Sequence, residues 1–172
     1  MKKIFIIFFI YFLQFNSVTA DTSISFIDMD QVMSISKPGS SILKQLKDIN
    51  IKNSKKFKEN AKILKEKEKK LISQKNILSE ENFQLNVDNL KNDIKKYNNN
   101  RNKINSDFSK LKIDSTNKLL KLINPILIKY SNEKSISLIL QKKDLIIGKT
   151  ELDITKKIIK IINNDIAEFK IQ

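Results

Sequence analysis

The chain has 172 residues, with no cysteine, no histidine and only two glycines, and its 33 basic and 19 acidic residues give a net charge of +14. The missing cysteine excludes disulfide bonds and a thiol nucleophile, and the missing histidine removes the commonest proton-transfer group and metal ligand. Because the sequence also lacks G-x-S-x-G, Walker and G-x-G-x-x-G motifs, we expect neither an enzyme nor a bound cofactor.

The first twenty residues have the pattern of a secretory signal peptide. Two lysines open the segment, residues 4–13 form an unbroken run of ten apolar side chains, and Val18, Thr19 and Ala20 are suited to cleavage. An uncleaved membrane anchor is the alternative, but it needs roughly 20 apolar residues to cross a bilayer. We therefore expect cleavage after about Ala20 and a soluble, exported protein that begins near Asp21.

The segment 21–41 is expected to form the first part of a compact body. Residues 24–28 have the composition of a strand, and residues 28–35 that of a brief helical turn. The Lys-Pro-Gly sequence at 37–39 favours a turn, so it should end this first helix. We expect the long helix that follows to begin at Ile42.

The segment 42–78 predicts a long helix with a narrow apolar seam. It contains no glycine or proline, and steps of seven residues select Leu43, Asn50, Phe57, Leu64, Leu71 and Leu78. Companion positions three residues further on are polar, namely Asn53, Asn60, Lys67 and Gln74. Because the seam is this thin, the helix suits an exposed arm better than a globular core.

The segment 83–122 predicts a second long helix. Alternating steps of four and three select twelve positions, nine of them apolar: Phe83, Val87, Leu90, Ile94, Tyr97, Arg101, Ile104, Phe108, Leu111, Ser115, Lys118 and Leu122. Ser79 followed by Glu80 and Glu81 fits an N-cap and a first helical turn, so a tight reversal is expected near residues 76–80. An antiparallel hairpin over 42–123 results, with helices roughly 55 to 60 Å long.

The segment 124–172 is expected to complete the body. Asn124 and Pro125 can stop or kink the second long helix, because proline cannot continue its hydrogen bonding. Residues 136–140 and 145–148 then predict a hairpin of two strands. A final amphipathic helix is predicted after Asp153 as its cap, with one apolar face made of Ile154, Ile158, Ile161, Ile162 and Ile166.

The expected body is too small to be stable alone. Three short strands leave open sheet edges that invite pairing with another chain, so self-association is the natural remedy. The candidate residues for oligomerisation are Ile24, Phe26, Ile136, Leu138, Leu140, Leu145, Ile147, Ile158 and Ile162. The predicted fold class is therefore mainly α with a small β part, in which a long antiparallel helical hairpin projects from a small α+β oligomerisation body.

The order of these elements resembles the Skp/OmpH family of periplasmic chaperones. The matching pieces are the opening ISFIDMDQVM, the charged hairpin with ILSEEN at its tip, the pair ISLILQKKDLIIG, and the closing LDITKKIIKII. The resemblance implies a periplasmic homotrimer whose body is built from strands and short helices of three subunits. It also implies that three hairpins enclose a cavity that takes in unfolded outer-membrane β-barrel proteins without ATP.

Contacts with such client proteins would come from the hairpin surface. Seam residues first of all join the two helices, so the better apolar candidates lie off the seam: Ile72, Ile77, Leu85 and Ile113. The basic candidates are Lys55, Lys56, Lys62, Lys69, Lys70, Lys95 and Lys96. Between Lys44 and Lys121 there are 21 basic and ten acidic residues, so acidic client segments and anionic lipid surfaces are candidate partners.

Two other functions compete with the chaperone hypothesis. A structural coiled-coil spacer of the cell envelope would need an anchoring segment, which the sequence does not show. Binding of nucleic acid through the lysines is disfavoured by the export signal, the single Arg101 and the few aromatic residues. We therefore predict an ATP-independent holdase, with the envelope spacer as the alternative.

Overall fold

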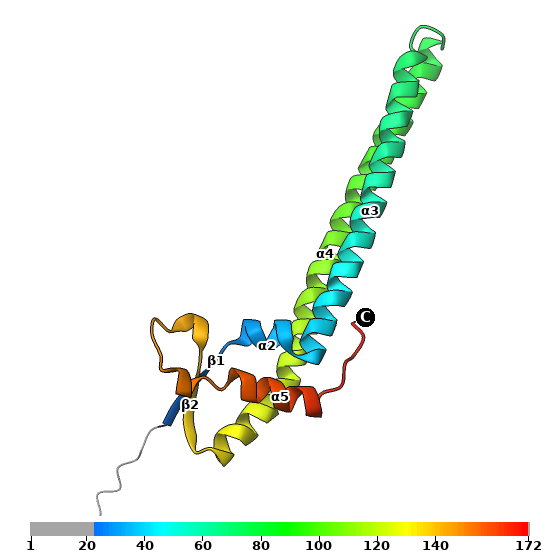
Figure 1. Cartoon of the computed structure of the whole chain (residues 1–172). Coiled ribbons are helices and arrows are strands. Elements are labelled where there is room, and N and C mark those ends of the chain that lie inside the picture. The colour runs from blue at the N-terminus through cyan, green and yellow to red at the C-terminus, as the bar shows by residue number, and fades with distance from the viewer. Residues whose placement is uncertain (1–22, 172) are drawn as a thin grey trace, which may run out of the picture.

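The computed structural model describes residues 23–171, in which two long helices form a hairpin that projects from a small body (Figure 1). The predicted signal peptide lies outside the described residues. The elements in chain order are β1 (Ser23–Ile27), α2 (Met29–Ile35), α3 (Lys37–Ser73), α4 (Glu80–Glu133), β2 (Ile136–Gln141), the 3-10 turns η1 (Lys142–Asp144) and η2 (Thr150–Leu152), and α5 (Thr155–Asp165). The predicted fold class, a helical hairpin on a small mixed body, is confirmed. None of the helices in this part of the chain is long and apolar enough to cross a membrane.

The first helix, α2, ends at Ile35, before residues 37–39, as predicted. The expected start of the long helix at Ile42 is wrong, because α3 begins at Lys37. Ser36 is its N-cap, and the Ser36 Oγ accepts a hydrogen bond from the Gly39 N–H at 3.2 Å. Pro38 lies in the first turn, where its missing N–H costs no helical hydrogen bond. A Cβ at Gly39 would clash with the carbonyl oxygen of Met33, so glycine allows α2 to approach α3 closely.

The tip of the hairpin is built as a capped reversal. The helix α3 ends at Ser73 and α4 begins at Glu80, so the connection covers residues 74–79. Ser79 is the N-cap that the sequence predicts, and its Oγ accepts the Asn82 N–H at 3.4 Å. Glu80 and Glu81 occupy the first turn, where carboxylates favour the positive end of the helix dipole.

The seam between α3 and α4 follows the predicted spacing over most of the hairpin, with departures at Ile94 and Arg101 in its middle and at four positions toward the body. Six predicted seam members are exposed instead: Leu43, Asn50, Ile94, Arg101, Lys118 and Leu122. At the body, neighbouring positions are buried in their place, namely Ile42, Leu46, Leu119 and Ile123. A two-helix seam requires a 3.5-residue repeat, whereas a helix covered from several sides follows its own 3.6-residue period, so the phase shifts.

Of the stop or kink predicted at Asn124 and Pro125, the stop does not occur, because α4 continues through both residues to Glu133. A proline inside a helix leaves the carbonyl four residues earlier without its N–H partner. Pro125 and Lys121, which carries that carbonyl, are both exposed, so water can replace the lost bond. The segment beyond Pro125 is anchored by the buried Tyr130, which favours continuation of the helix.

The small sheet contains two parallel strands within the described residues, and the predicted hairpin of strands at 136–140 and 145–148 is wrong. Strand β2 pairs with β1, with Ile24 opposite Leu138 and Phe26 opposite Leu140. After β2 the chain enters the turn η1 and forms no third strand. Gly148 lies against the ring of Phe26, where a Cβ would be 2.8 Å from the ring atom Cε1. Residues 145–148 therefore do not pair with β2, and Gly148 at their end packs against Phe26 of β1.

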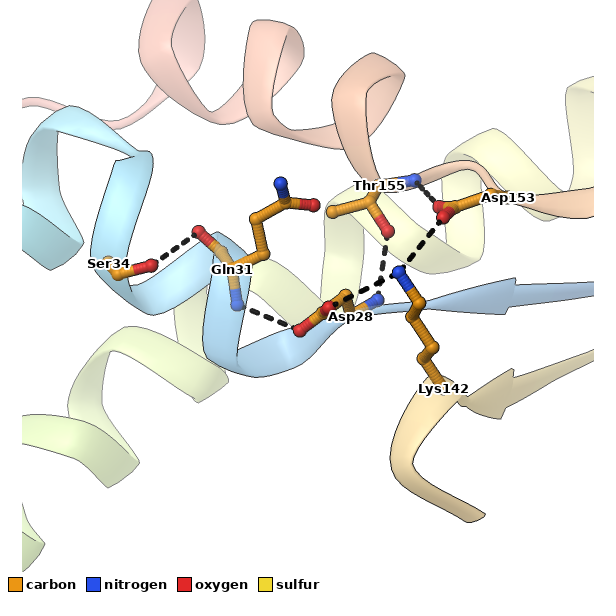
Figure 2. A network of polar contacts seen from close by, with 6 residues as sticks. All are labelled: Asp28, Gln31, Ser34, Lys142, Asp153 and Thr155. Atoms are coloured by element: carbon orange, nitrogen blue, oxygen red, sulfur yellow. Dashed lines mark hydrogen bonds and ion pairs between the residues drawn. The ribbon is translucent and has the colours of Figure 1, made fainter. Parts of the chain in front are cut away.

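A polar clamp fixes the ends of both strands to the start of α5 (Figure 2). The Lys142 Nζ lies 3.6 Å from the Asp28 Oδ2 and 3.8 Å from the Asp153 Oδ2. The Asp28 N–H donates to the Thr155 Oγ1 at 2.9 Å, and the Thr155 N–H donates to the Asp153 Oδ1 at 2.9 Å. Burial by itself raises the pKa of Asp153, but the hydrogen bonds from Thr155 and the charge of Lys142 hold this pKa below its ordinary value.

The hydrophobic core lies where the hairpin enters the body. Buried side chains from α2, α3, α4 and α5 meet there, including Val32, Ile42, Leu119, Ile123, Ile158 and Ile162. No residue between 47 and 114 is buried. We call residues 47–114 the distal hairpin, and residues 23–46 and 115–171 the body. The fold therefore separates a packed base from a pair of helices that contact mainly each other.

Candidate functional site

The candidate functional site is the surface of the distal hairpin. The helix α3 contains 37 residues, which corresponds to roughly 55 Å at 1.5 Å per residue. Only narrow rows of half-buried side chains join the two helices, such as Phe57, Leu64 and Leu71 on α3 and Phe83 and Leu90 on α4. The remaining surface of both helices faces outward and is available to a partner along the whole length.

The lysines predicted to contact clients all lie on this surface. Lys55, Lys56, Lys62, Lys69, Lys70, Lys95 and Lys96 are exposed. Among these seven, only Lys62 has a carboxylate within 4.0 Å in the described chain, that of Glu66 at 3.9 Å. The distal hairpin has 18 basic and ten acidic residues, so it keeps a net charge of +8. Such a surface attracts acidic chain segments over several Å.

The predicted apolar contacts are exposed as well. Ile72, Ile77, Leu85 and Ile113 have exposed fractions between 59% and 79%. The structure adds Ile51 and Ile63, which are about half exposed and which the sequence interpretation did not single out. Both fall between seam positions, and this spacing is the signal that could have identified them. These side chains are scattered singly over the helices, so they suit many weak contacts and not one binding pocket.

The middle of the seam is polar. The Lys67 Nζ on α3 donates to the Asp93 Oδ2 on α4 at 2.6 Å, and this hydrogen bond together with the positive charge of Lys67 lowers the pKa of Asp93. The Tyr97 hydroxyl donates to the Phe57 carbonyl oxygen at 3.3 Å, and the Arg101 guanidinium lies 5.8 Å from the centre of the Phe57 ring. These directional contacts fix the register of two helices that an apolar seam alone would hold loosely.

The predicted oligomerisation residues fall into two groups. Phe26, Ile158 and Ile162 are buried in the core of the single chain, so they support the body from inside. The others are half-buried or exposed: Ile24, Ile136, Leu138, Leu140, Leu145 and Ile147, of which Ile147 is 90% exposed. Beside β2 lies an open groove of about 460 Å³ that also includes Leu127 and Ile128 of α4. The sequence interpretation did not single out these two residues as oligomerisation candidates.

A thin, lysine-covered helical hairpin on a small packed body defines an elongated class of protein that presents an extended surface and no enclosed site within the described residues. A family model described as "Outer membrane protein (OmpH-like)" matches residues 23–162. The chain therefore belongs to the OmpH-like family, and the resemblance seen in the sequence is confirmed.

Comparison with solved structures gives the same fold. The crystal structure described as a "putative outer membrane chaperone (OmpH-like)" from Caulobacter crescentus matches with a TM-score of 0.78 and 11% sequence identity. The match covers 86% of this chain and 88% of the other. A sequence comparison with curated proteins finds no significant match. At this level of identity the similarity shows the fold, whereas the residues of the surface must be interpreted from this chain alone.

Proposed function

We propose that this member of the OmpH-like family is an ATP-independent holdase chaperone of the periplasm that receives unfolded outer-membrane β-barrel proteins between helical arms. The main support for this proposal is the distal hairpin. It has no buried residue over positions 47–114 and a net charge of +8. Its shape and charge support holding a partner along a surface, and they offer little to a chemical reaction on a small substrate.

The mechanism follows from what an unfolded β-barrel protein exposes. Its segments alternate apolar and polar side chains, and they aggregate by pairing of unprotected strands. Lysine stems can lie along apolar segments while their ammonium groups attract acidic ones. Exposed side chains such as Ile72 and Leu85 add weak apolar contacts. Many such contacts together keep a client apart from other chains. Because each contact is weak, the client is still free to leave.

Assembly of three copies through the body is part of the proposal. Two-stranded sheets are marginal alone, and β2 pairs only with β1 in the described chain, so the outer edge of β2 is free. The apolar groove next to it contains Leu127, Ile128 and Leu138, and the last two are 62% and 48% exposed. A second copy that covers this surface would bury it and would leave the hairpins to surround a common space.

Light scattering tests the proposal directly. A urea-unfolded outer-membrane β-barrel protein is diluted into buffer with a stoichiometric amount of the assembled protein, and the expected result is suppression of aggregation. The matched control removes two heptads from each helix, residues 58–71 and 88–101, so that seam phase, tip and body are kept. This shortened protein should stay folded and assembled but should lose most of the protection. Unchanged aggregation with the intact protein would refute the holdase function, and full protection by the shortened protein would show that the hairpins are not the holding surface.

A further inference from the structure

The segment that follows α5 is docked on the base of the hairpin. Residues 166–171 leave the helix in an extended conformation, and Ile166 has φ −112° and ψ 115°. The end of the described chain lies beside α3 (Figure 1). The family model matches residues 23–162, so this segment lies beyond the part that the match covers. We call residues 166–171 the tail.

One glutamine side chain binds the backbone of the tail. The Gln45 Nε2 on α3 donates to the Phe169 carbonyl oxygen at 3.0 Å, and the Ile171 N–H donates to the Gln45 Oε1 at 3.1 Å. The carbonyl of one residue and the N–H of the residue two positions later lie on the same edge of an extended chain. The amide of Gln45 therefore forms the two hydrogen bonds that a neighbouring strand would form. It binds backbone groups of the tail and not its side chains.

Two side chains of the tail add the remaining contacts. Ile171 is only 7% exposed and joins the hydrophobic core cluster. Phe169 is half-buried, and the Lys118 Nζ of α4 lies 4.6 Å from the centre of its ring. Ala167, Glu168 and Lys170 face outward. The base of the hairpin thus accommodates an extended chain that presents an aromatic and an aliphatic side chain at alternate positions.

We propose that the surface contacted by the tail is a binding site for an extended peptide segment. The tail occupies this site in the free protein, and an extended segment of an unfolded β-barrel client displaces the tail from it. The inference rests on the proposed chaperone function for the nature of the client. Alternating apolar side chains on an extended backbone are common to the tail and to the strands of β-barrel proteins. Since Gln45 recognises only backbone groups, a client segment can form the same two hydrogen bonds.

The test uses the full chain and a variant that ends after Asp165, with a fluorescein-labelled peptide of the sequence of residues 165–172 as the probe. In fluorescence anisotropy the truncated protein should bind the peptide at least tenfold more tightly than the full chain, whose site is occupied. Gln45→Ala in the truncated protein should weaken peptide binding at least threefold, and a peptide of scrambled sequence should not bind. Absence of peptide binding to a truncated protein with intact helicity would overturn the proposal.

A second variant covers the case in which truncation unfolds the body. Phe169→Ala in the full chain loosens the tail and leaves Gln45 and Lys118 unchanged, so peptide binding should rise severalfold over that of the full chain. An unchanged affinity for the peptide would count against replacement of the tail by the peptide. The client itself should bind the truncated protein at least twofold more tightly, and excess peptide should reverse this gain. Peptide binding without any effect on the client would show that the site serves only the tail, and this would overturn the inference.

The two proposals fail in different ways. If the full chain does not suppress aggregation but the truncated protein binds the peptide, the chaperone function is refuted while the peptide site stands as a site for the tail. If the full chain suppresses aggregation and the truncated protein binds neither peptide nor client more tightly, the holdase function stands and the peptide-binding site is refuted.

Discussion

Substitution of Leu119 by alanine measures how much of the stability resides at the base of the hairpin. Leu119 is fully buried in the cluster that joins α4 to α3 and α5. Removing a leucine side chain from such a core costs about 3 kcal/mol, because the transfer free energy is lost and a cavity remains. With a urea m-value of about 2 kcal/mol per M, the midpoint of unfolding should fall by roughly 1.5 M.

The matched control for this prediction is Leu64→Ala in the distal hairpin. Leu64 is half-buried in the seam and borders solvent, so its loss should cost only about 1 kcal/mol and shift the midpoint by roughly 0.5 M. Far-UV circular dichroism in urea measures both variants, at one fixed protein concentration because the proposed assembly would contribute to apparent stability. Equal shifts for the two variants would refute the conclusion that the body stabilises the hairpin.

Three further predictions concern charge, acid and the helix interior. Client capture should weaken as salt rises toward ~0.5 M, where the Debye length is only a few Å, and Lys69→Gln with Lys70→Gln should reduce this salt dependence in a binding titration. The lowered pKa of Asp153 means that its carboxylate stabilises the fold above about pH 4 and that this contribution is lost as the pH falls through the folded pKa. The free energy of unfolding in urea should therefore be about 1 kcal/mol larger for wild type than for Asp153→Asn at pH 6, and this difference should shrink as the pH is lowered below about 4. Pro125→Ala should raise the thermal midpoint, since alanine restores a helical hydrogen bond inside α4; a lower midpoint would contradict the continuous helix.

The sequence was sufficient to predict the hairpin, its capped tip and the final amphipathic helix, because each depends on local periodicity or capping. The predicted cap of the final helix is wrong, because its N-cap is Ile154, and Asp153 one residue earlier accepts the Thr155 N–H. Ser79 caps α4 as expected, and Ile158 and Ile162 face the core. The exposure of the candidate contact residues on the hairpin followed from the same periodicity. Their roles toward a client depend on a partner surface, which periodicity cannot describe.

The errors occur where distant residues decide the local structure. Residues 145–148 have the composition of a strand, but Gly148 fits against Phe26 and Lys142 is held by Asp28, more than 100 positions earlier in the chain. A parallel partner at that distance leaves no local signal in the sequence. Pro125 was interpreted as a stop or a kink from the chemistry of proline alone. Its exposed position, which allows the helix to continue, is set by the packing of the body.

The packing of the body determines where the tip of the hairpin lies. The helix α4 continues from the core residues Ser115 to Ile123 into the distal hairpin without a break, and Glu80 at its start lies 35 residues from Ser115. This length corresponds to roughly 52 Å, so a tilt of about 5° at the core displaces the tip by roughly 5 Å. No packing along residues 47–114 opposes such a tilt except the partner helix, which moves with it. In the proposed assembly, the size of the space between the hairpins would therefore be governed by side chains in the body, far from the surface that would contact a client.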